Sequence, residues 1–265
     1  MILASLALFL AQDAAAAAPA PQRTMAEDRL SVCLKHARTD PTSAIVEAST
    51  WSSQATGADS SYPQQCLGLA YTVLLRWDAA ERAFLAAREG ADAGDHFRRA
   101  QLATMAGNAA LAGERAVDAL GALELAANDA AASADDGLRA MVEVDRSRAL
   151  VMQGREAEAE ATLASARTLD PQSPFAWLLS ATLARRLGKL DEAQGYIETA
   201  AALAPGYPEI GLEAGVIAML AGRGEAAEAS WRSVIELAPN SAEATSARAY
   251  LAQAAELTGE ESAAQ

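Results

Sequence analysis

Apolar and polar positions follow a pattern that repeats every 34 residues over the second half of the chain. In each of three segments, a glycine is followed by an alanine and then by apolar residues spaced 4, 3 and 3 apart. Such spacings place the apolar side chains on one face of an α-helix. The three copies begin at Gly154, Gly188 and Gly222, and each ends at a proline. The period therefore predicts a series of similar units.

Each unit is predicted to hold two helices. The glycine marks a tight turn, because the end of a helix favours the left-handed backbone that glycine adopts without strain. The proline marks the end of the second helix, since the residue before a proline is pushed away from helical geometry. Ser173 followed by Pro174 has the pattern of an N-cap and first turn of the next helix.

An earlier segment carries a fuller version of the pattern. Residues 61–94 hold, at matching spacings, Leu67, Gly68, Tyr71, Ala80, Phe84 and Ala87. These residues resemble the tetratricopeptide repeat (TPR) family, although Gln64 and Asp92 replace its first aromatic residue and its final proline. The resemblance implies an all-α fold. We expect a TPR-like α-solenoid of antiparallel helix pairs that forms a right-handed superhelix with a C-terminal capping helix.

The repeats divide the chain into successive units. We predict an irregular N-terminal helical unit at 24–60, a TPR-like repeat at 61–94, a degenerate one at 95–127 and a linker at 128–139. Regular repeats are expected at 140–173, 174–207 and 208–241, a capping helix at 242–259, and a disordered tail at 260–265. A stack of this kind needs a polar-faced cap at its open end.

The N-terminus has the pattern of an export signal. Residues 2–11 are apolar apart from Ser5, and this run is too short to span a bilayer, which takes about 20 residues. Small residues follow, so we predict a signal peptide at 1–20 with cleavage within 14–20. No Lys or Arg precedes the run, and a short uncleaved anchor or a cytoplasmic adaptor are the alternatives. Export implies a periplasmic or secreted bacterial protein without an integral membrane segment.

Composition excludes several kinds of site. The 265 residues hold 21 Lys and Arg against 35 Asp and Glu, a net charge of −14, which disfavours nucleic-acid binding. Two cysteines and two histidines leave no metal site, and we expect no cofactor. The chain contains none of the common catalytic motifs. We therefore predict a non-enzymatic protein.

The two cysteines support two interpretations. Cys33 and Cys66 are 33 residues apart, which is close to one repeat, so they should occupy similar places on neighbouring units. In an oxidising compartment we expect them to form a disulfide, with two buried thiols as the alternative. Cys33 also lies one helical turn from His36, which leaves a nucleophile and its base as a weaker hypothesis.

The resemblance also implies where a partner binds. In the family, the first helix of each pair lines the concave surface, and positions i, i+4, i+7 and i+8 face the groove. The residues that these positions select here are Phe97, Gln101, Thr104, Met105, Val144, Arg148, Val151, Met152, Leu178, Thr182, Arg185, Arg186, Leu212, Val216, Met219 and Leu220, with Tyr250 on the last helix. This face is apolar and rich in methionine, and it carries three arginines.

Such a face suits an amphipathic helix or an extended peptide. Met152, Leu178, Met219 and Leu220 are the predicted apolar anchors, and the three arginines would attract an acidic segment. The sequence thus predicts a scaffold or adaptor of the bacterial cell envelope that binds another protein or peptide. A self-associating structural protein is the first alternative, and a periplasmic enzyme that uses Cys33 and His36 is the second.

Overall fold

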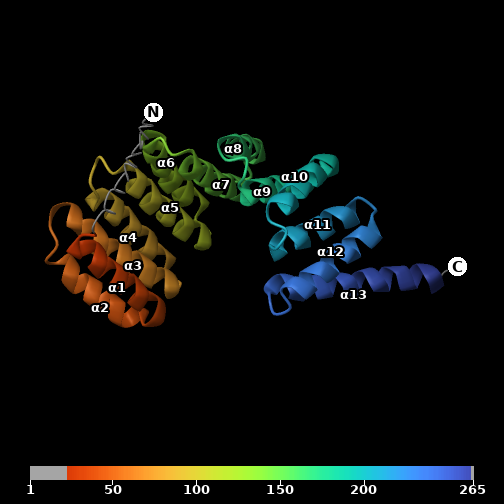
Figure 1. The fold of residues 1–265 in the computed structure, drawn as a ribbon, viewed down its shortest axis with the longest axis horizontal. Helices are drawn as coiled ribbons and strands as arrows, with labels where there is room; N and C mark the ends of the chain where they lie inside the picture. The colour runs from red at the N-terminus through yellow and green to blue at the C-terminus, as the bar shows by residue number, and fades with distance from the viewer. Residues whose placement is uncertain (1–22, 264–265) are drawn as a thin grey trace, which may run out of the picture.

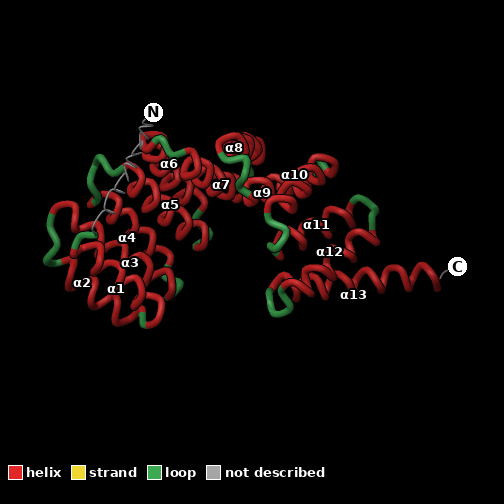
Figure 2. The backbone as a smooth tube through the Cα atoms, viewed as in Figure 1, coloured by secondary structure: helices red, strands yellow, loops and turns green. Residues whose placement is uncertain are grey.

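The computed structural model describes residues 23–263, with side chains to residue 256. The predicted signal peptide, residues 1–20, lies outside the described part. Within that part the chain consists of helices and loops, without strands (Figure 2). The elements are α1 (Met25–Thr39), α2 (Pro41–Ser52), the 3₁₀-helix η1 (Gly57–Ser60), α3 (Ser61–Val73), α4 (Trp77–Gly90), α5 (His96–Ala112), α6 (Ala116–Ser133), α7 (Asp136–Met152), α8 (Glu156–Leu169), α9 (Pro174–Arg186), α10 (Leu190–Leu203), α11 (Pro208–Leu220), α12 (Gly224–Leu237) and α13 (Ala242–Ala263).

The helices form a stack of antiparallel pairs. Each helix from α1 onward packs against the next one along the chain, and α5, α7, α9, α11 and α13 also contact one another in series. The odd-numbered helices of this series therefore share one layer. Figure 1 shows the pairs following each other from α1 and α2 at one end of the molecule to α13 at the other. The predicted all-α solenoid is confirmed, and α13 ends it as a single helix.

A small residue opposite a large one holds the two helices of a pair together. Gly68 faces Phe84, Gly107 faces Leu123, and Gly215 on α11 faces Trp231. A Cβ atom at Gly68 would lie 2.5 Å from the Phe84 ring, so only glycine permits this approach. The large partners are buried. Close packing of this kind explains why a chain so rich in small residues still forms a core.

The turns within pairs have a common backbone conformation. Gly154, Gly188 and Gly222 lie at the turns α7–α8, α9–α10 and α11–α12 with φ values of +70°, +75° and +73°. These are the glycines that recur every 34 residues in the sequence. Glycine recurs there because it adopts the left-handed conformation without strain. The same conformation occurs in the two preceding turns at Leu75 and Glu114, with φ values of +55° and +57°.

Two predicted boundaries were wrong. The linker expected at 128–139 is helical except at its centre, because α6 continues to Ser133 and α7 begins at Asp136. Asp129 is buried in α6 rather than solvated in a loop, and its carboxylate accepts hydrogen bonds from Arg88 and Arg99 at 2.7 and 3.4 Å. At the other end, α13 continues through Ala263, into the segment predicted as a disordered tail.

Candidate functional site

A groove runs between α7 and α9 in the layer of odd-numbered helices. It consists of two adjoining pockets of about 500 and 220 Å³ that share Arg148 and Leu179 in their walls. The larger pocket is bordered by Met141, Val144 and Phe175. The smaller one is bordered by Val151, Met152, Thr182 and Arg186 and has Leu111, Leu163 and Leu183 at its base. We refer to the two pockets together as the α7–α9 groove.

The walls of this groove are apolar and accessible. Met141, Met152 and Phe175 are each 45% exposed, whereas Leu163 and Leu183 beneath them are buried. Large apolar side chains exposed side by side mark sites where another apolar surface binds. Methionine has flexible side-chain torsions, so the two methionines can adapt to different bound side chains.

Two arginines border the groove. Arg148 donates hydrogen bonds to Asp145 and Asn108 at 3.1 and 3.3 Å, while about half of its side chain stays exposed. Arg186 is exposed and makes no ion pair among the described residues. Arg148 is thus paired with Asp145, which lines the groove together with Asp170, and Arg186 is the arginine that brings an unpaired positive charge to the edge of the apolar groove.

A second, smaller pocket lies between α11 and α13. It has a volume of about 200 Å³ and is bordered by Val216, Met219, Leu220, Trp231 and Tyr250. The rings of Trp231 and Tyr250 are 5.2 Å apart between centroids, and Leu220 is 56% exposed. We call it the α11–α13 pocket.

The structure distributes the predicted groove residues over several places. Val144, Arg148, Val151, Met152, Thr182 and Arg186 meet in the α7–α9 groove, and Val216, Met219, Leu220 and Tyr250 meet in the α11–α13 pocket. Phe97, Gln101 and Met105 on α5 border neither site. Leu178 and Leu212 are partly buried against the core. Thr104 is buried, and its hydroxyl donates to the Ala100 carbonyl at 2.8 Å.

The predicted rows left out several residues of the α7–α9 groove, among them three large apolar side chains at its border. Met141, Phe175 and Leu179 all border it, and the predicted rows began one turn too late to include the first two. The repeat does contain the signal, since Met141 and Phe175 are 34 residues apart, as are Arg148 and Thr182 and also Met152 and Arg186. Leu179 is aligned in the same way with Asp145.

An ion pair occupies the corresponding place between α9 and α11. The Arg185 guanidinium donates to the Glu213 carboxylate through Nε at 2.6 Å and through Nη2 at 3.3 Å. Both side chains are largely buried. Arg185 was predicted to be free to attract a partner, and this pairing corrects that expectation because its charge is already neutralised.

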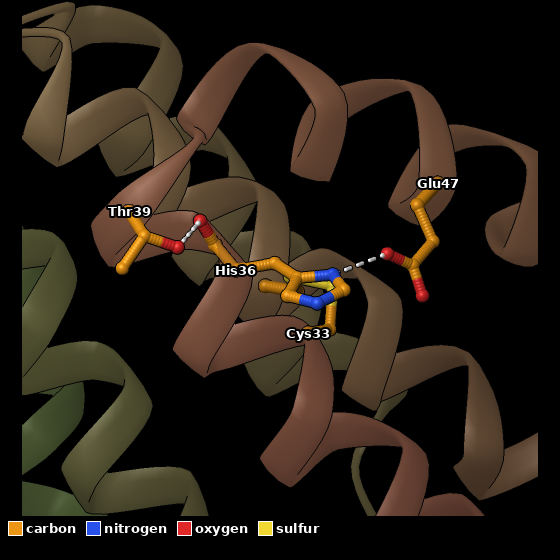
Figure 3. The surroundings of a disulfide bond; sticks show 5 residues. Cys33, His36, Thr39 and Glu47 are labelled. Atoms are coloured by element: carbon orange, nitrogen blue, oxygen red, sulfur yellow. Dashed lines mark hydrogen bonds and ion pairs between the residues drawn. A yellow bond between two sulfur atoms is a disulfide. The ribbon is translucent and has the colours of Figure 1, made fainter.

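Cys33 and Cys66 are joined by a disulfide between α1 and α3, with a Cα–Cα distance of 6.0 Å, as the sequence predicted. Both residues are fully buried. Figure 3 shows His36 beside this bond, where its Nδ1 lies 3.2 Å from a carboxylate oxygen of Glu47. Because Cys33 is bonded to Cys66, it offers no free thiol that His36 could activate.

The pairs of helices with a groove in one layer define a helical-repeat protein with the TPR fold. The solved structures similar to it include PilW, described as a widely conserved type IV pilus biogenesis factor, with a TM-score of 0.67, 17% identity, and coverage of 85% of this chain and 99% of that one. PilF from Pseudomonas aeruginosa has a TM-score of 0.63 at 16% identity, with 85% and 97% covered. A thermophilic TPR protein from Thermus thermophilus, TTC0263, has a TM-score of 0.57 at 20% identity, with 73% and 98% covered.

Neither the protein-family models nor the curated proteins gave a match. At these levels of identity, the solved structures show the fold. Within the described residues, the acidic, histidine and cysteine side chains form no cluster of three that could hold a metal ion. A search of the same residues for helices long and apolar enough to cross a bilayer found none.

Proposed function

We propose that this protein is a non-enzymatic scaffold that binds a peptide or helix of a partner protein in the α7–α9 groove. The observation that carries the proposal is the pair of adjoining pockets bordered by Met141, Met152 and Phe175, three large apolar side chains left exposed by the fold. Stacked helix pairs commonly present such a surface to partners. A bound apolar side chain would replace water over these residues, which is favourable.

The bound segment is expected to be apolar with acidic flanks. Arg148 and Arg186 border the smaller pocket from opposite helices, so a carboxylate next to a buried apolar side chain could reach either guanidinium. Charge-assisted hydrogen bonds of this kind are stronger than neutral ones. They would also select the partner's register, because the two arginines lie at fixed places along the groove.

We further propose that the protein acts in the bacterial cell envelope. The apolar run at residues 2–11 supports export. The Cys33–Cys66 disulfide supports an oxidising compartment, where such bonds persist. PilW, which shares the fold, is a pilus biogenesis factor, and an assembly role of a similar kind is consistent with a scaffold. N-terminal sequencing of the protein purified from the periplasmic fraction of the bacterium tests the location. Recovery of the protein in the cytoplasm with Met1 still present would contradict it.

The groove is tested by selecting peptides from a random displayed library on the full chain. The expected peptides carry one large apolar residue next to Asp or Glu, and their affinity falls at least tenfold with Met152→Glu. Val117→Glu is the matched control, because Val117 is an exposed apolar residue on α6, outside the groove. Selected peptides that bind both variants equally well would overturn the assignment.

A further inference from the structure

Equivalent positions of the repeat line the smaller pocket of the α7–α9 groove and the α11–α13 pocket. The smaller pocket has Met152 on one wall and, 34 residues further along, Arg186 on the other. The α11–α13 pocket has Leu220, 34 residues after Arg186, on one wall and Ala254, a further 34 residues along, on the other. A second series with the same spacing borders the same two pockets and consists of Arg148, Thr182, Val216 and Tyr250. The repeat therefore forms the same pocket twice, and the two volumes are similar, about 220 and 200 Å³.

The interface between these two pockets carries charge instead of a pocket. There α9 packs against α11, and Arg185 is paired with Glu213. The next residue of α9, Arg186, is exposed and has no acidic partner among the described residues. Because α9 lies between α7 and α11 in the series of contacting helices, the charge of Arg186 lies between Met152 and Leu220. The layer thus presents an apolar pocket, an unpaired cation and a second apolar pocket, in that order.

The spacing of the helices defines the spacing of side chains that such a surface can bind. Packed helices lie about 8–10 Å apart between their axes, so Met152 on α7 and Leu220 on α11, two helices further along the layer, are separated by roughly 16–20 Å. An α-helix rises about 1.5 Å per residue, so two of its side chains about 11 to 14 residues apart match this separation. Residues at intervals of 7, 11 and 14 return to nearly the same face of a helix.

The walls of the two pockets favour a helix over an extended peptide. The Thr182 hydroxyl already donates to a carbonyl of its own helix at 3.1 Å, and the Trp231 indole N–H donates to a carbonyl of α11 at 3.3 Å. In the α11–α13 pocket, Gln253 and the Tyr250 hydroxyl are the other polar groups on the wall. An extended backbone would lose hydrogen bonds to water on such a surface, whereas a helix satisfies its own backbone groups.

Building on the proposed function, we propose that the α7–α9 groove and the α11–α13 pocket together bind one amphipathic helix of a partner protein. A large apolar side chain of that helix enters the smaller pocket beside Met152, and a second one, 11 to 14 residues away, covers Leu220. An acidic side chain between them, seven residues from the first, reaches Arg186. Apolar surface is covered at both ends, and the charge in the middle selects the register.

Synthetic alanine-based helices of about 20 residues, titrated into the full chain by calorimetry, test the proposal. The parent peptides carry two leucines, 11 or 14 residues apart, and a glutamate seven residues from the first. We expect Met152→Glu and Leu220→Glu each to weaken the binding of the tighter parent at least tenfold. Val117→Glu is the matched control and should leave it unchanged. Met152 and Leu220 are about half exposed, so both variants should keep the circular dichroism spectrum of the wild type.

Altered peptides show whether both pockets act on one ligand. Replacing either leucine by alanine should remove the response to one of the two variants, because that pocket is then empty. Leucines nine residues apart lie on opposite faces of a helix, so this peptide should bind no better than a peptide with one leucine. Arg186→Glu should weaken the parent about threefold, and a peptide with lysine in place of glutamate should bind that variant better than the wild type.

The outcomes separate this proposal from the proposed function. A parent peptide that responds to Met152→Glu but not to Leu220→Glu would overturn the two-pocket site and leave the α7–α9 groove standing. A parent that binds no better than the peptide with leucines nine apart would overturn it as well. Absence of binding by all of these peptides would also overturn it, and the peptides selected from the random library then decide the proposed function independently.

Discussion

The two successive helix interfaces on either side of α9, with α7 and with α11, occupy equivalent places in the repeat but have opposite chemistry. Between α7 and α9, Val151 faces Leu179, and the space beside them stays open as a pocket. Between α9 and α11, the residues 34 positions further along are Arg185 and Glu213, which form an ion pair. The two interfaces therefore differ in chemistry because of one pair of side chains in each.

This difference shows how one interface of a repeat array can stay open while the next equivalent interface is filled. An apolar pair leaves a surface that gains by being covered, whereas a paired arginine and glutamate already satisfy each other. The backbone repeat supplies the groove several times, and the side chains decide which copy is available. Binding is therefore a property of particular residues at positions that the repeat makes equivalent.

Loss of the disulfide between α1 and α3 should have the largest effect on stability, and it sets a scale for the effect of the ion pair between α9 and α11. Replacing both cysteines, as Cys33→Ala with Cys66→Ala, should lower the free energy of unfolding by about 3–4 kcal/mol, since the unfolded chain loses a constraint on a loop of some 33 residues. Urea unfolding followed by circular dichroism measures it. If the double cysteine variant loses less free energy of unfolding than Glu213→Leu, the expected order of the two effects is wrong.

Breaking the ion pair between α9 and α11 should have the next largest effect. Glu213→Leu leaves the Arg185 guanidinium largely buried without its partner, and we expect a loss of about 2 kcal/mol. The double variant with Arg185→Val reproduces the apolar pair of the neighbouring groove and should recover most of that loss. The same urea titration checks both. If the double variant is no more stable than Glu213→Leu alone, the two grooves are not equivalent.

The reverse exchange introduces an ion pair into the open α7–α9 groove, at the positions equivalent to Arg185 and Glu213. Val151→Arg with Leu179→Glu should change stability by no more than about 1 kcal/mol, because both positions are partly exposed. The new pair should close the smaller pocket, so a peptide selected on the wild-type chain should bind at least tenfold more weakly. Isothermal titration calorimetry measures the affinity. Unchanged affinity would mean that the peptide does not occupy this pocket.

Removing the unpaired arginine should have the smallest effect on stability. Arg186→Ala should change the free energy of unfolding by less than about 0.5 kcal/mol, since the side chain is exposed. It should slow association with an acidic peptide and reduce the salt dependence of that rate. Stopped-flow mixing at two ionic strengths measures both. Arg185→Ala is the matched comparison, and it should instead act on stability because it leaves Glu213 unpaired.

The fold was predictable from sequence because the repeat is local. The glycine at each turn, the spacings of 4 and 3, and the closing proline all act within a few residues of one another. The linker was mispredicted for the opposite reason. Asp129 sits in a small, acidic stretch that looks like a loop, and its helical, buried state depends on Arg88 and Arg99 from other helices.

The candidate site was predictable in part for the same reason. Arg148, Met152 and Thr182 follow from their places along each helix, which the repeat defines. The pairing of Arg185 with Glu213 joins residues 28 apart on neighbouring helices, and no local pattern reports it. Whether a groove position is free thus depends on the residue opposite, which only the packed structure supplies.

The disulfide also determines how the molecule would respond to a pulling force. When both ends of the chain are pulled, tension passes from Cys33 directly to Cys66 and bypasses the end of α1, all of α2 and η1, and the first turn of α3. A fully extended chain spans about 3.5 Å per residue, so the bypassed segment withholds roughly 115 Å of extension until the bond is reduced. Helices α4 to α13 have no such shortcut among the described residues. The array is therefore mechanically asymmetric, and reduction lengthens it at one end.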